Sequence, residues 1–280
     1  MKSTIQSNYV LLCFYFVYLI FLYFLFQSSF VIILILHGIL ILIALTPIGE
    51  GIMRLLNHTK KIKTREYQDY LYPLFEEVYE QAKKQNPHLS QNITLFMNND
   101  TSPNAFACAS NTVCVTKGAI DFFTREELQG VLAHEFGHLS NNDTKVCMVF
   151  VIGNLLVIVF MTLFNALFWV ADTIVSMFQG RDHIALRVVR WLKKVISNLG
   201  SMLVGAIFSL NSRVCEYGAD KFAHDIGFGA ELRRALGMLQ KLDGGGDMTL
   251  MDRIYASHPD TENRIAQLES LEDFEEDEGL

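Results

Sequence analysis

The sequence predicts a mainly α-helical fold with a small β-sheet, in which a polar domain is combined with about four transmembrane helices. Three observations support this prediction. Hydrophobic residues make up 51% of the 280 positions and are concentrated in long runs. Elsewhere, apolar residues recur at helical spacing over most of the chain and alternate with polar residues in one short stretch. Two histidines four positions apart, His134 and His138, lie on one of the predicted helices.

Changes in composition divide the chain into five parts. Two hydrophobic pairs of segments alternate with two polar segments, and an acidic tail ends the chain. The predicted parts are an N-terminal transmembrane hairpin (1–49), the first part of the polar domain (50–145), a second hydrophobic pair (146–212), the second part of the polar domain (213–271) and the acidic tail (272–280).

Charge and cysteine content exclude two classes of protein. The formal net charge is −7, with much of the acid in the last dozen residues, so the basic footprint of a nucleic-acid-binding protein is lacking. The five cysteines are odd in number and include no C-x-x-C pair, which argues against a disulfide framework and favours a reducing compartment. They are Cys13, Cys108, Cys114, Cys147 and Cys215.

Two apolar runs, Tyr9 to Phe26 and Phe30 to Ala44, open the chain. Each approaches the length needed to cross a hydrocarbon core of about 30 Å. A secretory signal peptide is disfavoured because the first run is long, lacks a small-residue cleavage site and is followed at once by the second. The short linker predicts a hairpin with both ends on one side. Basic residues from Arg54 to Arg65 follow it, which predicts a cytoplasmic location for the chain after residue 50.

A helix and a small sheet precede the histidine pair. Apolar residues from Thr64 to Lys84 recur near helical spacing, and Pro87 ends this helix. Ile93 to Met97 alternates as a strand, and Asn104 to Cys108 and Thr112 to Thr116 have the composition of two more. We therefore expect a sheet of about three strands ahead of the motif helix.

The histidines lie on a helix with a strong start signal. Thr124 and Glu127 form a capping-box pattern, so His134 and His138 fall about three turns into the helix. Residues four apart lie on one face of a helix, so both imidazoles can reach one metal ion, with the Glu135 carboxylate beside them. This H-E-x-x-H pattern is the arrangement found in zinc metalloproteases.

A second hydrophobic pair follows the motif. Val146 to Phe178 is strongly apolar, and Ile196 to Leu210 is a weaker span with small residues that suit helix packing in a membrane. The intervening stretch, Arg181 to Lys194, is basic and would face outward if both segments cross, against the positive-inside tendency. It is interpreted either as an interfacial amphipathic helix or as evidence that the pair is partly re-entrant.

The C-terminal part supplies further charged side chains. A helix carries Glu216 and Asp220 one turn apart, and a second helical region covers Ala230 to Leu242. A flexible break at Gly244 to Gly246 comes next, and His258-Pro259 opens a final helix. The acidic residues from Glu272 to Glu278 predict a disordered tail.

A catalytic zinc ion needs three protein ligands and an open position for water. His134 and His138 supply two, and Glu216 is the best candidate for the third. Asp220 would then hydrogen-bond the second nitrogen of a ligand histidine and fix its tautomer. Zinc would lower the pKa of its water toward 7, and Glu135 would accept the proton and return it to the leaving amine, which describes peptide-bond hydrolysis without a covalent intermediate.

Jointly, these motifs resemble the HtpX-type membrane zinc proteases, relatives of the CAAX prenyl endopeptidases. The likeness covers nearly the whole chain. The matching features are H-E-x-x-H, Glu216 to Asp220 as E-x-x-x-D, Asn104-Ala-Phe-Ala before the motif helix, Asn141 and Asp143 after it, the hydrophobic pair between the second and third ligands, and His258-Pro259 with Arg264 six residues beyond the histidine. Four candidate spans rather than about seven favour the bacterial HtpX type over the prenyl-processing enzymes.

The resemblance implies a zincin-like (gluzincin) catalytic domain and assigns roles within it. The implied zinc ligands are His134, His138 and Glu216, with Glu135 as the base and Asp220 supporting the ligands. Asn104, Ala105, Phe106 and Ala107 would form the edge strand that pairs with an extended substrate. His258 and Arg264 would lie near the metal and stabilise the tetrahedral oxyanion.

The preferred function is a zinc endopeptidase, with one Zn²⁺ per chain, of the bacterial cytoplasmic (inner) membrane. Its active site would face the cytoplasm, and its substrates would be damaged, misfolded or unfolded membrane proteins, as in a stress response. Two alternatives stay open: a membrane protease that matures a specific lipidated substrate, and a membrane-anchored scaffold that binds zinc structurally. A structural site would need a fourth ligand, and no obvious one is present. The sequence predicts a lipid bilayer as a partner, no nucleic acid, and no particular oligomeric state.

Overall fold

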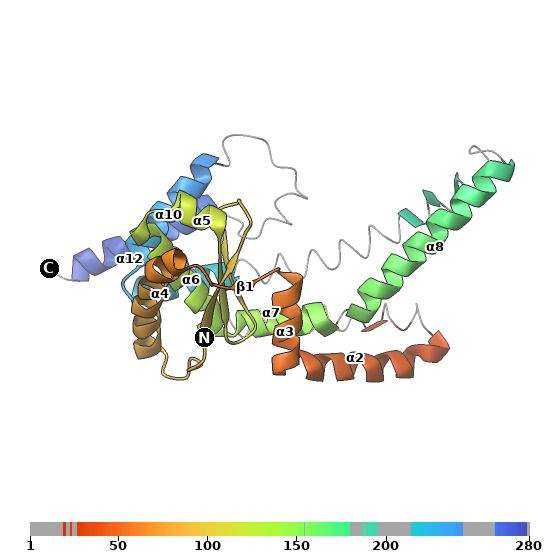
Figure 1. The fold of residues 1–280 in the computed structure, drawn as a ribbon, viewed down its shortest axis with the longest axis horizontal. Helices are drawn as coiled ribbons and strands as arrows, with labels where there is room; N and C mark the ends of the chain where they lie inside the picture. The colour runs from red at the N-terminus through yellow and green to blue at the C-terminus, as the bar shows by residue number, and fades with distance from the viewer. Residues whose placement is uncertain are drawn as a thin grey trace.

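The computed structural model describes residues 19, 20, 23, 27–153, 155–179, 187, 188, 190, 191, 193, 194, 214–242 and 261–278. The helices are η1 (Gln27–Ser29), α2 (Phe30–Ala44), α3 (Pro47–Leu56), α4 (Arg65–Gln85), α5 (Lys117–Phe122), α6 (Arg125–Asn141), α7 (Asp143–Gly153), α8 (Leu155–Gln179), α10 (Gly229–Leu242) and α12 (Thr261–Glu278). Residues 214–225 are also helical. The strands are β1 (Lys60–Lys61), β2 (Thr94–Asn98), β3 (Ala105–Cys108) and β4 (Thr112–Thr116). The predicted mainly helical fold with a small sheet is confirmed (Figure 1).

The four strands form one mixed sheet in the order β1-β2-β4-β3. β2 and β4 run parallel, whereas β1 and β3 pair antiparallel with their neighbours. The three predicted strands are present within one residue of their expected bounds. β1 was not expected, because two exposed lysines carry no apolar alternation. β3 therefore lies at one edge of the sheet and β1 at the other.

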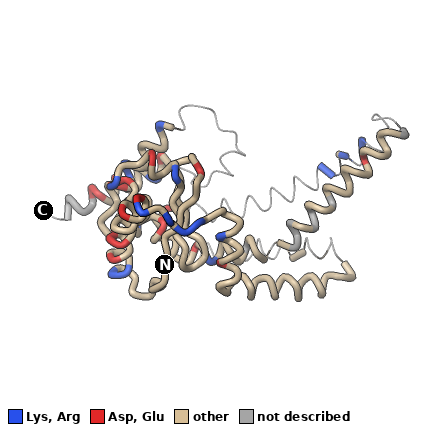
Figure 2. The backbone as a smooth tube through the Cα atoms, viewed as in Figure 1, with Lys and Arg blue, Asp and Glu red and all other residues tan. Residues whose placement is uncertain are grey.

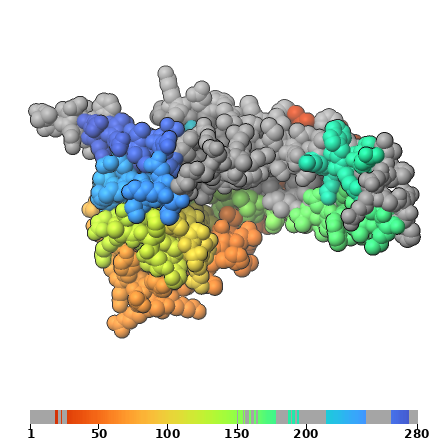
Figure 3. All heavy atoms as spheres, turned by 90° about the horizontal axis from the view of Figure 1, so that it is seen from above, coloured from red at the N-terminus to blue at the C-terminus, as the bar shows by residue number. Residues whose placement is uncertain are grey.

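The core of the polar domain lies between the sheet and a row of helices. Helix α6 packs against α4 and α10, and α10 packs against α12. Figure 3 shows this row as a colour sequence from orange α4 through yellow-green to the blue of α10 and α12. Phe136 of α6 is fully buried, and its ring lies 5.3 Å from that of Phe75 and 5.6 Å from that of Tyr79. The motif helix is therefore the central element of the core.

Two glycines let α6 approach its neighbours closely. A Cβ atom on Gly130 would lie 2.2 Å from the backbone nitrogen of Leu232 in α10. A Cβ atom on Gly137 would lie 2.7 Å from the Cα atom of Ala219, in the 214–225 helix. These distances leave no room for a side chain, so only glycine fits at either crossing. The crossing at Ala219 holds the 214–225 helix against the histidine-bearing turn of α6.

Two long apolar helices, α2 and α8, extend to the same side, away from the sheet (Figure 1). Among the described residues, the stretch Gln27–Ala44 is long and apolar enough to cross a membrane, with a mean hydropathy of 2.3. Asn165–Met177 in α8 is a shorter apolar stretch. The predicted span Phe30 to Ala44 coincides with α2. Of the other predicted spans, Tyr9 to Phe26 lies outside the described residues except at 19, 20 and 23, and Ile196 to Leu210 lies outside them altogether.

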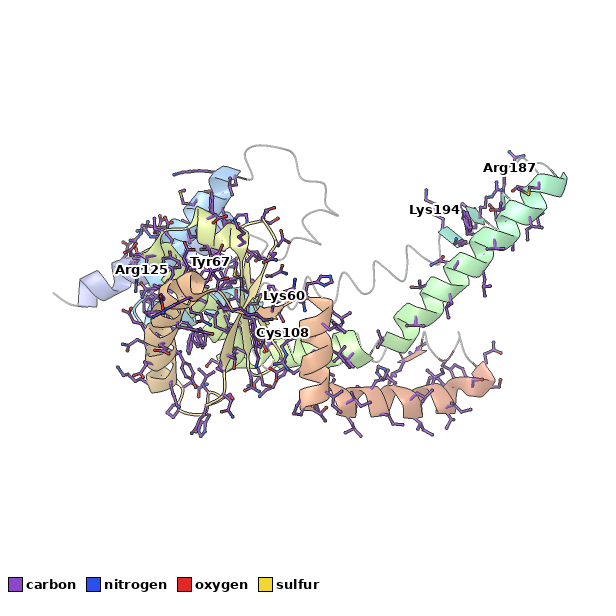
Figure 4. The ribbon with its side chains drawn as sticks, viewed as in Figure 1. Lys60, Tyr67, Cys108, Arg125, Arg187 and Lys194 are labelled. Atoms are coloured by element: carbon purple, nitrogen blue, oxygen red, sulfur yellow. The ribbon has the colours of Figure 1, made fainter. Side chains whose placement is uncertain are left out.

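Two of the described residues in the basic stretch after α8, Arg190 and Lys193, contact that helix. Arg190 donates from Nε to Asp172 at 2.7 Å and from Nη2 to Ser176 at 2.8 Å. The Lys193 ammonium lies 4.5 Å from the centre of the Phe168 ring. Figure 4 places Arg187 and Lys194 beside the far half of α8. The described residues of this stretch are thus held against α8 by an ion pair, a hydrogen bond and a cation–π contact.

The C-terminal acidic residues are helical, so the prediction of a disordered tail is wrong. Helix α12 continues through Glu278. Arg233 of α10 contacts Glu269 at 3.5 Å and Glu272 at 3.2 Å, which fixes the middle of α12. Glutamate is also a good helix former, so the acidic segment extends the helix. The predicted glycine break, Gly244 to Gly246, lies outside the described residues.

A second, smaller cluster of buried residues joins the apolar helices to β3. It contains Ala44 of α2, Met53 of α3, Cys108 and Ala109 at the end of β3, and Met148 and Ile152 of α7. In addition, His37 of α2 lies with Nδ1 2.7 Å from the carbonyl oxygen of Gly153 at the end of α7. The four described cysteines, Cys108, Cys114, Cys147 and Cys215, are free thiols.

The close crossing at Gly137 is testable with a matched glycine. We expect Gly137→Ala to lower the free energy of unfolding by about 1–3 kcal/mol, because the added methyl group overpacks the crossing. Gly237 in α10 has no atom within 4 Å of its Cβ position, so Gly237→Ala should instead raise helix stability, by about 0.5–1 kcal/mol. Thermal unfolding of both variants measures the difference. An unchanged midpoint for Gly137→Ala would contradict the crossing.

Candidate metal centre and active site

Helix α6 brings His134 and His138 to one point inside the domain. Thr124 accepts a hydrogen bond from the Glu127 backbone, and the Glu127 side chain accepts one from the Thr124 backbone, so the predicted capping box is confirmed. The two histidines lie one turn apart with their Nε2 atoms separated by 3.1 Å. Their side chains are 3% and 11% exposed. The imidazoles therefore point toward a common, enclosed position.

The 214–225 helix adds a carboxylate at the same position. Glu216 Oε2 lies 3.4 Å from His134 Nε2, and Glu216 Oε1 lies 3.5 Å from His138 Nε2. One ligand atom from each of the three residues lies within 4.8 Å of the other two, and the set could hold a metal ion. Two ligand atoms of a tetrahedral zinc ion, each at about 2.0–2.1 Å from it, are separated by about 3.3 Å. The observed spacing fits such an ion.

Both histidines are oriented by carboxylates on their other ring nitrogen. His134 Nδ1 lies 2.8 Å from Asp220 Oδ1, and His138 Nδ1 lies 2.9 Å from Asp143 Oδ2. When Nδ1 donates its proton to a carboxylate, Nε2 of a neutral imidazole carries the lone pair. The two Nε2 atoms and the Glu216 carboxylate are then acceptors that face one another. The two lone pairs and the carboxylate repel one another unless a cation lies among them. A metal ion bound at this position would supply that cation.

Asp143 is part of this arrangement although the sequence assigns it no role. It lies five residues beyond His138, which is not a same-face spacing on a continuous helix. Asn142 ends α6 in the left-handed conformation, with φ of 62°, and Asp143 begins α7. The turn at Asn142 brings the Asp143 carboxylate back to His138. A search for residues that share one face of a regular helix therefore does not find the contact between Asp143 and His138.

Arg264 of α12 reaches the site through a fully buried guanidinium. It donates to both oxygens of Asp220 at 2.7 Å, from Nε to Oδ2 and from Nη2 to Oδ1. Its third nitrogen, Nη1, lies 2.9 Å from Glu216 Oε2. The residue is 2% exposed and Asp220 is 0% exposed. Arg264 thus joins the candidate metal ligand Glu216 to the carboxylate that orients His134.

The electrostatics of the site favour positive charge among the three donors. Burial lowers the pKa of His138, but hydrogen bonds to Asp143 and Glu216 outweigh burial and raise that pKa to about 10. The pKa of His134 is also raised, since contacts with Asp220 and Glu216 outweigh burial and the Arg264 charge. Burial raises the pKa of Asp220, yet His134 and Arg264 hold it at about 2. A divalent cation would take the place of the protons that these carboxylates attract.

Glu135 lies beside the donor cluster and is held from the edge strand. The Ala107 backbone N–H donates to Glu135 Oε2 at 2.6 Å, and Glu135 is 2% exposed. Thr116 N donates to Asn104 O, so in the antiparallel register the backbone groups of Ala105 and Ala107 point away from β4. The predicted strand residues are therefore next to the motif helix. His258 lies outside the described residues.

Comparison with known proteins supports a common origin. Residues 68–272 match Peptidase family M48. A protein named Protease HtpX homolog from Thermoanaerobacter pseudethanolicus is 26% identical over 197 residues, which cover 63% of this chain and 65% of that protein. The protein of the same name from Salinibacter ruber is 30% identical over 197 residues, covering 60% of this chain and 64% of that protein.

The fold is also similar to a solved structure. The crystal structure of S. mikatae Ste24p aligns with a TM-score of 0.50 and 21% sequence identity, covering 95% of this chain and 64% of that chain. The chain thus spans about two thirds of the length of the first relatives that it matches. The family match covers most of the chain and includes all the residues of the donor cluster. This chain belongs to Peptidase family M48.

Proposed function

We propose that this chain is a zinc-dependent endopeptidase anchored in the bacterial cytoplasmic membrane, with its active site on the cytoplasmic side. The observation that carries the proposal is the convergence of His134 Nε2, His138 Nε2 and the Glu216 carboxylate within 4.8 Å, beside the Glu135 carboxylate. Membership of a peptidase family and relatives named Protease HtpX homolog support peptide bonds as the substrate.

His134, His138 and Glu216 would hold the zinc ion. When bound, zinc supplies Lewis-acid polarisation of the scissile carbonyl and makes water more acidic. Asp220 and Asp143 keep the two imidazoles in the tautomer that presents Nε2. Arg264 holds Glu216 and Asp220 in fixed positions through three hydrogen bonds. The protein's own groups thus preorganise the ligands before any substrate arrives.

Glu135 is the proton carrier in this proposal. Its carboxylate would accept a proton from the attacking water and deliver it to the nitrogen of the leaving amine, which completes hydrolysis without a covalent enzyme intermediate. The hydrogen bond from Ala107 N–H fixes one oxygen of the carboxylate, Oε2, and leaves the other for proton transfer. The base is thereby positioned by the same strand that would bind the substrate.

The substrate would bind as an added strand along β3. No further strand pairs with this edge in the described part of the chain. The Ala107 N–H is held by Glu135, so the groups directed toward the edge for a substrate are those of Ala105 and the Ala107 carbonyl. An extended polypeptide can use these groups whatever its side chains are. Backbone recognition suits an enzyme that cuts damaged or misfolded membrane proteins of many sequences. We therefore favour protein quality control over the maturation of one lipidated substrate.

Three donors, rather than four, favour catalysis over a structural zinc site. Among the described residues, His134, His138 and Glu216 form the one group of at least three histidine, cysteine or acidic side chains with metal-ligand spacing. A structural zinc ion is normally closed by four protein ligands, whereas three ligands leave a position for water. A purely structural scaffold would also give Glu135 no function.

The proposed location rests on the apolar helices. Helix α2 exposes Val31, Ile32, Ile35 and Leu42, and α8 exposes Leu163, Leu167, Trp169 and Met177. Large apolar side chains along two helices that extend from the polar domain suit contact with lipid. Four spans, two within residues 1–49 and two within residues 146–212, form part of this proposal, as does a catalytic domain built from residues 50–145 and 213–271. The basic residues after α3 support a cytoplasmic position for the polar domain.

The role of Glu135 is tested by Glu135→Gln. Glutamine keeps an oxygen that accepts from Ala107 N–H but cannot carry a proton, so we expect cleavage of an unfolded membrane protein to fall at least about 100-fold. Zinc content should stay unchanged, because Glu135 is not in the donor group. Glu126→Gln, an exposed glutamate on the same helix, is the control. Substantial cleavage by a zinc-loaded Glu135→Gln protein would refute the mechanism.

Arg264→Lys separates two roles for this arginine. A lysine cannot form the paired hydrogen bonds to Asp220 while also reaching Glu216, so we expect zinc affinity to fall about 10–100-fold in a chelator titration. Arg234→Lys, at a surface pair with Glu231, should leave zinc affinity unchanged. Normal zinc affinity with a lower rate of cleavage would instead support the oxyanion role that the family resemblance implies for Arg264.

A further inference from the structure

Helix α3 exposes an apolar face next to the proposed membrane helix. Ile48 and Leu55, seven residues apart and so on one side of the helix, are 66% and 76% exposed. Leu56 is 53% exposed, and Leu45, just before the helix, is 59% exposed. Large apolar side chains gathered on one short helix mark a surface that binds a membrane or a protein.

The opposite face of α3 is fixed to the polar domain. Gly49, Glu50 and Met53 are buried. Glu50 accepts hydrogen bonds from Thr112 Oγ1 at 2.7 Å and from Asn111 Nδ2 at 3.2 Å, at the turn between β3 and β4. These bonds determine which side of α3 faces outward. The apolar face therefore has a fixed orientation relative to the edge strand.

A sharp corner joins α3 to α2. Thr46 caps α3 by accepting from Ile48 N, and Pro47 starts the helix. A Cβ atom on Gly49 would lie 2.4 Å from the carbonyl oxygen of Ala44, so glycine is required where the two helices meet. Figure 1 shows α3 running across the direction of α2. If α2 crosses a bilayer, α3 lies along the bilayer surface.

A basic cluster follows directly at the end of α3. Lys60, Lys61 and Lys63 are exposed, and within the described residues none of these three is in an ion pair. Figure 4 places Lys60 at the end of α3, and Figure 2 shows basic residues there while acidic residues gather over α4 and α12. A basic segment thus lies next to the apolar helices.

We propose that α3 is an interfacial helix whose apolar face lies in the surface of an anionic phospholipid bilayer, with Lys60, Lys61 and Lys63 at the level of the lipid phosphates. This proposal rests on the membrane location proposed above. The occupant is a bilayer rather than a protein partner because the apolar face continues from α2, and because the adjoining charge complements anionic lipid.

The proposed contact sets the height of the substrate-binding strand above the membrane. Glu50 and Met53 connect α3 to the β3–β4 turn, and the Ala107 N–H of β3 holds the proposed base Glu135. A fixed height would select polypeptide segments that leave the bilayer close to its surface. The choice of substrate would then depend on how far a polypeptide segment lies from the membrane surface, rather than on its amino-acid sequence.

A lipid-quenching experiment tests the apolar face. The full chain, carrying Glu135→Gln to prevent self-cleavage, is placed in nanodiscs of phosphatidylcholine and phosphatidylglycerol with brominated acyl chains. A fluorescent amino acid replaces Leu55 in one sample and the exposed α4 residue Glu76 in the control. We expect strong loss of fluorescence at position 55 and none at 76. Equal quenching at the two positions, or none at 55, overturns the proposal.

Charge reversal tests the lysines. Lys60→Glu with Lys61→Glu should abolish the enrichment of phosphatidylglycerol over phosphatidylcholine among lipids retained by the protein. Lys84→Glu with Lys241→Glu, which changes net charge equally at exposed sites on α4 and α10, should preserve that enrichment. The proposal is overturned if the enrichment of phosphatidylglycerol is unchanged in the first variant. It is also overturned if a cross-linker attached at position 55 captures a second copy of the chain, because the apolar face would then contact protein. Neither readout involves proteolysis, so failure of the proposed peptidase function would appear separately, in the Glu135→Gln comparison.

Discussion

The candidate site depends on one close contact between two helices that are far apart in sequence. Gly137 of α6 and Ala219 of the 214–225 helix approach within a distance that excludes any side chain at position 137. Glu216 and Asp220 flank Ala219, so the contact brings both carboxylates to the histidines of α6. Neither helix alone can hold a metal ion, because two histidines and one carboxylate come from different elements. The glycine within H-E-x-x-H therefore has a structural function in this chain.

Burying so much charge requires compensation within the site. Glu135, Glu216 and Asp220 are at most 4% exposed, and the guanidinium of Arg264 is buried with them. An isolated buried charge costs several kcal/mol, and breaking a buried pair costs about 3–5 kcal/mol. The paired bonds from Arg264 to Asp220 offset part of this cost, and a divalent cation among the three donors offsets more. Metal binding should therefore stabilise the fold as well as supply reactivity.

The sequence predicts elements whose signal is local and misses those that depend on a turn or on distant contacts. The capping box at Thr124 and Glu127 locates α6, and the apolar run from Phe30 to Ala44 locates α2 to the residue. Asp143 is noted in the sequence only as a residue that matches the family, and its contact with His138 is missed because it depends on the left-handed conformation of Asn142.

Two further differences have the same cause. Helix α3 has a local start signal, since Thr46 caps it and Pro47 begins it, but its two glycines in ten residues lower its helix propensity. Contacts of Glu50 with the β3–β4 turn also hold it. The acidic segment after Glu272 lacks an apolar pattern, but Arg233 on another helix fixes α12 through Glu269 and Glu272. In both places tertiary contacts add to what the local sequence supplies.

A series of contacts connects the candidate metal site to the apolar helices. Asp143, which orients His138, is the first residue of α7, and α7 packs along α2 with the Gly153 carbonyl 2.7 Å from His37. The Glu216 helix lies beyond the apolar segment that follows α7. A shift of α2 relative to α7 would therefore move Asp143 and change the orientation of His138. In the proposed membrane location, insertion of the apolar helices would therefore affect the geometry of the candidate metal site.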